Sequence, residues 1–157
     1  MHPYSTLTPD LVLEAVESLG HRCDGRVLAL NSYENRVYQV GREDGPPVVV
    51  KFYRPARWST PAIMEEHAFG LELARAEVPV VAPDVLDGRT LFESGGFRYA
   101  VYRRQGGRWP ELGTKDERRW MGRFLARIHA VGRTRQFRHR PSLDWRVLGG
   151  ETMGFLL

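Results

Sequence analysis

Cysteine is nearly absent from this chain, since Cys23 is the only one among 157 residues. A single cysteine excludes an internal disulfide and a zinc site built from cysteine pairs. The five histidines show no HExxH spacing or comparable metal-binding pattern. No apolar run approaches the roughly 20 residues of a membrane helix, and the first residues lack the basic and apolar regions of a secretory signal. A cytoplasmic protein with no membrane partner is therefore the default expectation.

Lysine is also scarce. The chain has two, Lys51 and Lys115, against 21 arginines, with a net charge of +4 and a pI of about 9.6. This mildly basic balance fits an anionic ligand without requiring nucleic acid. No aromatic platform or nucleic-acid-binding motif accompanies the densest basic segment, so we interpret it as a solvated linker rather than a nucleic-acid contact. Its arginines are Arg133, Arg135, Arg138 and Arg140.

A charged side chain stands inside a strongly apolar segment. The run Val-Val-Val-Lys-Phe-Tyr at 48–53 is β-branched and aromatic, which predicts a buried or half-buried strand. A charge in such a strand is costly unless something pairs with it. Because arginine supplies positive charge elsewhere, Lys51 indicates a role for a compact ammonium that reaches a phosphate or a carboxylate. The alternative is an edge-strand lysine whose ammonium extends into water.

The order of elements predicts an α+β fold. The first helix follows Thr8-Pro9, a cap and a first-turn proline, and ends at Gly20. We predict strands at 27–32, 36–40, 48–53, 90–93 and 97–103, and further helices at 61–76 and 114–131. Short connections between the first three strands are typical of an antiparallel meander. The expected architecture is a five-stranded antiparallel sheet with one helix between its third and fourth strands.

A second unusual charge lies on the helix predicted at 61–76, because Glu66 interrupts its apolar face. An inward lysine on the sheet and an inward glutamate on the adjoining helix can both stay charged if they pair, although such a pair need not add net stability. The alternative is a solvated helix acid. The predicted face consists of Ile63, Glu66, Gly70, Leu73 and Ala74.

The last predicted helix has an apolar side and an arginine side. Arg119, Arg123 and Arg127 lie on its polar side. If Trp120, Phe124 and Ile128 are exposed, self-association through this surface is expected. We interpret His129 as a packing or hydrogen-bonding residue. The predicted inner face consists of Met121, Phe124, Leu125 and Ile128.

These features together resemble the N-terminal lobe of the kinase-like phosphotransferases, the superfamily of aminoglycoside and choline phosphotransferases. Two long blocks, LNSYENRVYQ at 30–39 and VKFYRPARW at 50–58, are similar to bacterial stress response kinases of the serine/threonine type. The resemblance runs from about residue 7 to about residue 141. Further matching blocks are Glu65-Glu66-His67, Val78-Pro79-Val80-Val81-Ala82-Pro83 and His139-Arg140-Pro141.

The resemblance implies ATP and Mg²⁺ as cofactors and a role for each matching position. Lys51 would grip the α- and β-phosphates, and Glu66 would hold Lys51, with Glu65 as the alternative partner. The polar turn Ser32, Tyr33, Glu34 and Asn35 would lie over the phosphates. The adenine would lie between Leu30, Val37 and Val49, and the main chain of a hinge would read its edge. That hinge would be Val101, Tyr102 and Arg103. By itself, the turn at 32–35 matches no glycine-rich phosphate loop.

Phosphoryl transfer in this superfamily uses an H-G-D-x-x-x-x-N-like loop and a D-x-D-like stretch, and neither occurs here. The resemblance therefore implies a nucleotide-binding lobe at 1–104 and a hinge with the beginning of a helical second lobe at 105–157, with no metal ligand in this chain. We interpret the chain as interrupted and expect it to bind ATP without transferring phosphate. The acceptor would be a protein hydroxyl. The alternatives are a small-molecule acceptor, such as an amino alcohol or sugar, and a non-catalytic nucleotide- or partner-binding module.

Overall fold

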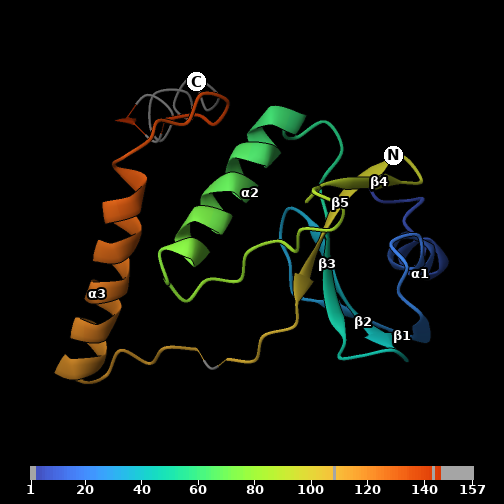
Figure 1. Cartoon of the computed structure of the whole chain (residues 1–157), viewed down its shortest axis with the longest axis horizontal. Coiled ribbons are helices and arrows are strands. Elements are labelled where there is room, and N and C mark those ends of the chain that lie inside the picture. Colours follow the sequence, from blue (N-terminus) through green and yellow to red (C-terminus); the bar gives the residue numbers. More distant parts are fainter. Residues whose placement is uncertain (1–2, 108, 143, 146–157) are drawn as a thin grey trace, which may run out of the picture.

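The computed structural model describes residues 3–107, 109–142 and 144–145. The elements in chain order are α1 (Pro9–Glu17), β1 (Cys23–Leu30), β2 (Arg36–Arg42), β3 (Val48–Phe52), α2 (Thr60–Arg75), β4 (Phe92–Ser94), β5 (Phe97–Arg103) and α3 (Lys115–Gly132). Figure 1 shows the sheet at one end of the molecule, α1 on its outer side, and α2 between the sheet and α3. In these described ranges, no helix is long and apolar enough to cross a membrane.

The five strands form one antiparallel sheet in the order β1-β2-β3-β5-β4, which confirms the predicted fold class. β1 begins four residues earlier than predicted, because the strand continues past an irregularity in register between Cys23 and Val27, where Gly25 has a φ of +83°. β4 begins at Phe92 rather than Thr90. The Thr90 hydroxyl instead lies 2.8 Å from Nδ1 of His67, on α2.

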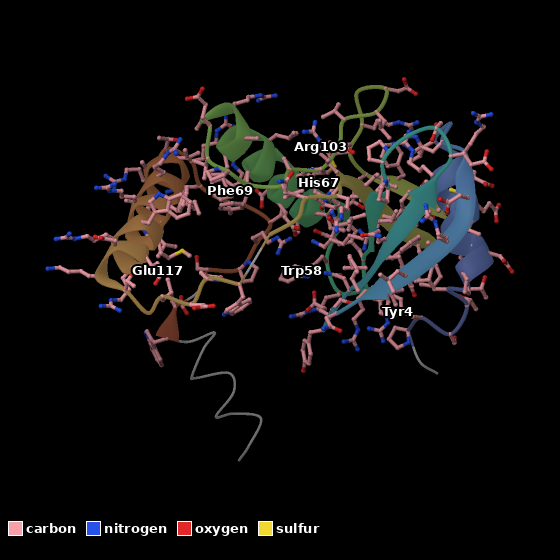
Figure 2. All side chains as sticks on the ribbon, turned by 90° about the horizontal axis from the view of Figure 1, so that it is seen from below. Tyr4, Trp58, His67, Phe69, Arg103 and Glu117 are labelled. Atoms are coloured by element: carbon pink, nitrogen blue, oxygen red, sulfur yellow. The ribbon has the colours of Figure 1, made fainter. Side chains whose placement is uncertain are left out.

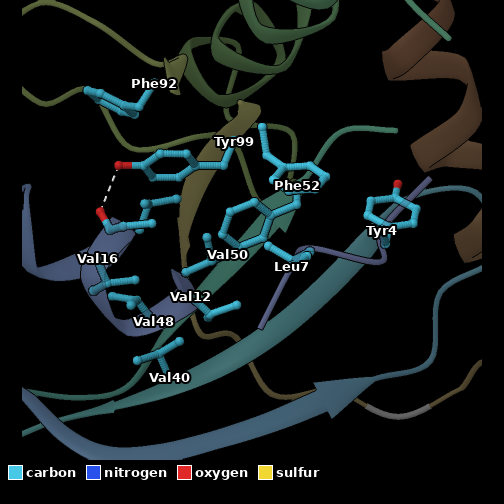
Figure 3. Packing of buried hydrophobic residues seen from close by; sticks show 13 residues of the cluster. Tyr4, Leu7, Val12, Val16, Val40, Val48, Val50, Phe52, Phe92 and Tyr99 are labelled. Carbon is cyan, nitrogen blue, oxygen red and sulfur yellow. Dashed lines mark hydrogen bonds between the residues drawn. The ribbon is translucent and has the colours of Figure 1, made fainter. Parts of the chain in front are cut away.

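One face of the sheet forms the main hydrophobic core with α1 (Figure 3). Thr8 accepts a hydrogen bond from the Leu11 amide at the helix start, and Pro9 follows it, as the sequence predicted. The helix buries its apolar stripe against alternate residues of the central strands, because side chains alternate between the two faces of a strand. The fully buried members are Val12, Ala15, Val16, Val40, Val50, Phe52 and Val101.

Tyr99 fastens α1 to the sheet. Its ring is stacked on Phe52 with centroids 5.4 Å apart, and its hydroxyl donates to the Ala15 carbonyl at 2.7 Å (Figure 3). We predict that Tyr99→Phe lowers the free energy of unfolding by about 1 kcal/mol, because one buried hydrogen bond is lost while the ring packing remains and the Ser18 hydroxyl still donates to the Ala15 carbonyl at 2.8 Å. Chemical denaturation measures this loss, and Tyr33→Phe, at a fully exposed position, is the matched control. Equal stability of the two variants would contradict the prediction.

The other face of the sheet packs against α2. Ser59 caps this helix. The apolar face of α2 contributes Ile63 to a second small core, together with Tyr53 and Ala100. The predicted inward face is right for Ile63 and Leu73 and wrong for Ala74, which is exposed. The prediction missed His67, which is buried four residues after Ile63 on the same face.

α3 lies alongside α2 and runs in the opposite direction (Figure 1). The predicted inner face is partly correct: Phe124 and Ile128 are half-buried, but Leu125 is 49% exposed. Arg127 was placed on the polar side, yet its guanidinium donates to the carbonyls of Ala76 and Glu77 at the end of α2. Arginine reaches that far because its long stem lies along the helix surface. Of the three residues named as a self-association surface, Trp120 is exposed but Phe124 and Ile128 are half-buried. Self-association stays a prediction.

Candidate functional site

A cleft of about 420 Å³ opens on the α2 side of the sheet. Strand register sets its lining, since Val37 pairs with Lys51 and Val49 pairs with Tyr102, and directly paired residues share a face. The volume lies within the usual range for small-molecule sites, roughly 300–1,000 Å³. The cleft is lined by Val37, Val49, Lys51, Glu66, Val81, Tyr102, Arg103 and Gln105.

Lys51 and Glu66 form an ion pair at the cleft. The Lys51 ammonium donates to Oε1 of Glu66 at 2.6 Å and lies 4.7 Å from the ring centroid of Tyr53. Burial favours a higher pKa for Glu66, but the hydrogen bond and charge of Lys51, together with the charge of Arg140, outweigh it and hold that pKa below its ordinary value. Glu66 is therefore ionised at neutral pH. The pair was expected from the sequence, and neither side chain is free in solvent.

Glu65 faces a different partner. Its two carboxylate oxygens accept from the backbone amides of Arg138 and His139 at 2.6 and 2.9 Å. Glu65 was the alternative partner expected for Lys51, and the structure assigns that place to Glu66 alone among the described residues. Helical geometry explains the difference, because consecutive residues point about 100° apart around the axis.

The second oxygen of Glu66 accepts from the Arg140 guanidinium. Nε of Arg140 also donates to the Ala62 carbonyl at 3.1 Å, and the guanidinium lies over the Trp58 ring, 4.3 Å from its centroid. Arg135 pairs with Glu72 at 2.5 Å. Interpreting this segment as a solvated linker is therefore wrong for Arg140, which is 24% exposed, whereas Arg135 keeps a side chain 70% exposed beside its carboxylate partner. The cause is tertiary: the segment after α3 returns along α2, where three glutamates face it.

The polar turn at 32–35 is tied to the segment between β3 and α2. Glu34 accepts from Nε of Arg57 and from Nε1 of Trp58, each at 2.8 Å, and the Arg57 hydrogen bond chiefly holds its pKa below the ordinary value. The side-chain oxygen of Asn35 accepts from the Arg54 amide at 3.2 Å. Ser32 is half-buried and Tyr33 is fully exposed. The carboxylate of Glu34 thus positions the turn through protein contacts.

The predicted hinge divides into two parts. Tyr102 and Arg103 line the cleft. Val101 points into the core on the opposite face, and its carbonyl accepts from the Asp84 amide at 2.8 Å. Gln105 also lines the cleft, although it was not among the predicted site residues. Leu30 pairs with Val37 but is not one of the lining residues.

A buried polar network lies behind the ion pair. His67 is 1% exposed, with Nε2 at 2.6 Å from the Tyr53 hydroxyl and Nδ1 at 2.8 Å from the Thr90 hydroxyl. The Tyr53 hydroxyl lies 3.3 Å from that of Tyr102, at the cleft wall. Burial lowers the pKa of His67 to about 4, so this histidine is neutral at pH 7. Figure 2 shows His67 where α2 meets the sheet. Its i, i+4 spacing from Ile63 was the available sequence signal.

The cleft suits a nucleotide better than a protein-held metal. Three valines and an aromatic ring supply apolar walls, and one ammonium lies at the end nearest α2. The only carboxylate in the lining, Glu66, already faces two cations. Throughout the described ranges, no group of three or more histidine, cysteine or acidic side chains is arranged to hold a metal ion. A divalent ion here would need phosphate oxygens as ligands.

A family model described as "Phosphotransferase enzyme family" matches residues 26–151, which is most of the chain. The chain therefore belongs to this phosphotransferase family. Stress response kinase A of Escherichia coli K12 is 46% identical over 140 residues, covering 89% of this chain and 43% of that protein. The serine/threonine protein kinase RdoA of Salmonella typhimurium shows the same identity and coverage. The chain thus spans less than half the length of these curated relatives.

Two solved structures share the fold. An amicoumacin kinase, hAmiN, in complex with AMP-PNP, Ca²⁺ and Ami has a TM-score of 0.72 at 22% identity, covering 97% of this chain and 50% of that one. A microcompartment-associated aminopropanol kinase has a TM-score of 0.63 at 23% identity, covering 90% and 47%. These likenesses confirm a kinase-like fold for the described residues.

Proposed function

We propose that this chain is the ATP-binding lobe of a serine/threonine protein kinase of the stress response kinase A type. The observation that carries the proposal is the Lys51–Glu66 ion pair at the wall of an apolar cleft. An ammonium held by a carboxylate beside an apolar slot can contact anionic phosphates while the slot takes a planar base. In this proposal, residues 1–104 form the nucleotide lobe, and residues 105–157 form the hinge and the beginning of a second lobe.

The bound nucleotide would be oriented by three parts of the chain. Val37, Val49 and Tyr102 would enclose the adenine, and the main chain at 103–105 would read its edge, since the Val101 carbonyl already has a partner. Lys51 would contact the α- and β-phosphates, with the turn at 32–35 above them. Mg²⁺, held through phosphate oxygens, would supply charge neutralisation during phosphoryl transfer.

The acceptor is the finer part of the proposal. A protein hydroxyl is favoured by the 46% identity to curated kinases, one of which is named a serine/threonine protein kinase. A small amino-containing alcohol is the second candidate, favoured by the fold shared with the aminopropanol kinase. An assay with labelled ATP separates the two candidates. The protein that contains this lobe is incubated with serine-containing proteins and with aminopropanol, and the acceptor that carries the label identifies the substrate class.

We predict that the 157-residue chain binds Mg-ATP and does not transfer phosphate. Binding would raise the melting temperature, because a ligand that binds only the folded state stabilises it by mass action. Transfer would not occur, because the chain contains neither of the acidic motifs that this chemistry uses. Thermal shift measures the first part and labelled ATP with a casein acceptor measures the second. A well-folded sample without a shift, or measurable turnover, would contradict the prediction.

A further inference from the structure

The segment that follows α3 is fixed to α2 along one stripe of the helix. The Phe137 ring packs edge-on against Phe69 with centroids 5.4 Å apart, and Arg135 pairs with Glu72. Glu65 accepts two backbone hydrogen bonds from residues 138 and 139. Positions 65, 69 and 72 follow the i, i+4, i+7 spacing of a single helix face. Figure 1 shows the segment returning toward the first turns of α2.

The Lys51–Glu66 pair lies beside this stripe. Oε1 of Glu66 accepts from Lys51, and Oε2 accepts from Arg140, so the carboxylate is held from both sides. Arg140 is itself held by the Ala62 carbonyl and by the face of Trp58. A planar guanidinium that two other groups hold in place can orient a carboxylate, whereas a flexible ammonium mainly supplies charge.

Trp58 extends the same connection to the polar turn. Its indole Nε1 donates to Glu34 at 2.8 Å, while its ring lies beneath Arg140. A continuous chain of contacts therefore runs from the turn at 32–35 through Trp58, Arg140 and Glu66 to Lys51. In the proposed function, both ends of this chain face the phosphates.

We propose that Arg140 is a positioning residue of the nucleotide site, which orients Glu66 toward Lys51 and links that pair to the turn at 32–35. The effect of Arg140 on nucleotide affinity rests on the proposed function, but its effect on the position of Lys51 does not. The side chains of Arg140 and Glu66 are 24% and 35% exposed, and an ion pair that is partly buried need not add net stability. Loss of the Arg140 side chain would instead change the orientation of the Glu66 carboxylate.

The scarcity of lysine provides the test. In a chain labelled with ¹³C at lysine Cε, two signals are expected, from Lys51 and Lys115. We expect Arg140→Ala to move the Lys51 signal toward the Lys115 signal without nucleotide, and to weaken Mg-ATP binding about tenfold, a usual size for coupling between contacting charged groups. Arg140→Lys should restore part of both, because it keeps the charge and loses the fork.

Arg127→Ala is the matched control. Arg127 also connects α3 to α2 but donates to Ala76 and Glu77, away from Glu66. It should leave the Lys51 signal and the affinity unchanged. The inference is overturned if the Lys51 signal does not move in folded Arg140→Ala. If that variant does not fold, Arg140→Lys is used in its place. An equal change in Arg127→Ala would also overturn the inference. If the signal moves as expected but the wild type binds no Mg-ATP, the positioning role stands and the proposed function fails.

Discussion

Lys51→Ala is expected to remove nearly all of the thermal stabilisation that Mg-ATP gives the wild-type chain. At an ATP concentration about 100 times the dissociation constant, binding stabilises the folded state by about 2.7 kcal/mol. For a chain of this size, that corresponds to a rise in melting temperature of roughly 5–10 °C. A charge-assisted contact to phosphate is worth up to about 3 kcal/mol, or about 100-fold in affinity. At the same ATP concentration, the variant would then gain about 0.4 kcal/mol, a shift of roughly 1 °C.

The prediction is decided by the change in melting temperature that Mg-ATP causes in each variant, because the substitution also alters the stability of the unliganded protein. Without Lys51, Glu66 keeps only Arg140 as a cationic partner among the described residues. Lys115→Ala is the matched control, since Lys115 is the other lysine and begins α3, outside the cleft. A full shift in Lys51→Ala, or an equal loss in Lys115→Ala, would remove the basis for placing the phosphates at Lys51.

The sheet and its inward charges were accessible from the sequence because both follow from local patterns. β3 was recognisable from β-branched residues in one run, and Glu66 from a charge that breaks an apolar helical stripe. Capping residues marked the helix starts, as with Thr114 and Glu117, which form the predicted capping box. Each of these signals lies within a few residues of the feature that it predicts.

The contacts that surround the ion pair were not accessible in the same way. Arg140 is 74 residues from Glu66, and Thr90 is 23 residues from His67. Their pairing depends on how the segment after α3 and the segment before β4 return to α2. From the sequence, Arg140 was interpreted as a solvated arginine and Thr90 as a strand residue, which is what is usual for each residue type. Tertiary packing then overrode those roles, because a buried polar group needs a partner wherever the chain can supply one.

His67 should make the stability of this protein depend on pH in a window where most proteins of this size change little. Its pKa is lowered by burial to about 4, against about 6.5 in an unfolded chain. Between these values the unfolded state binds a proton that the folded state does not, so the free energy of unfolding falls as pH falls. The loss sets in around pH 6.5 and reaches roughly 2.5 kcal/mol by pH 4.5. Above pH 7 both states are neutral and the effect is absent.

His67→Gln isolates this contribution. Glutamine can keep a hydrogen bond to the Tyr53 hydroxyl but does not titrate, so its effect on stability should be constant with pH. The pKa of His21 is also lowered by burial, and it acts in the same window, but it is common to both proteins and cancels in their difference. Carboxylates with lowered pKa values, such as Glu66, lose their contribution mainly below about pH 4.5. Denaturant titrations between pH 7 and pH 4.5 should therefore show the stability curves of the wild type and of His67→Gln converging or crossing. Parallel curves would contradict the prediction, because they would mean that His67 binds its proton equally well in the folded and the unfolded chain.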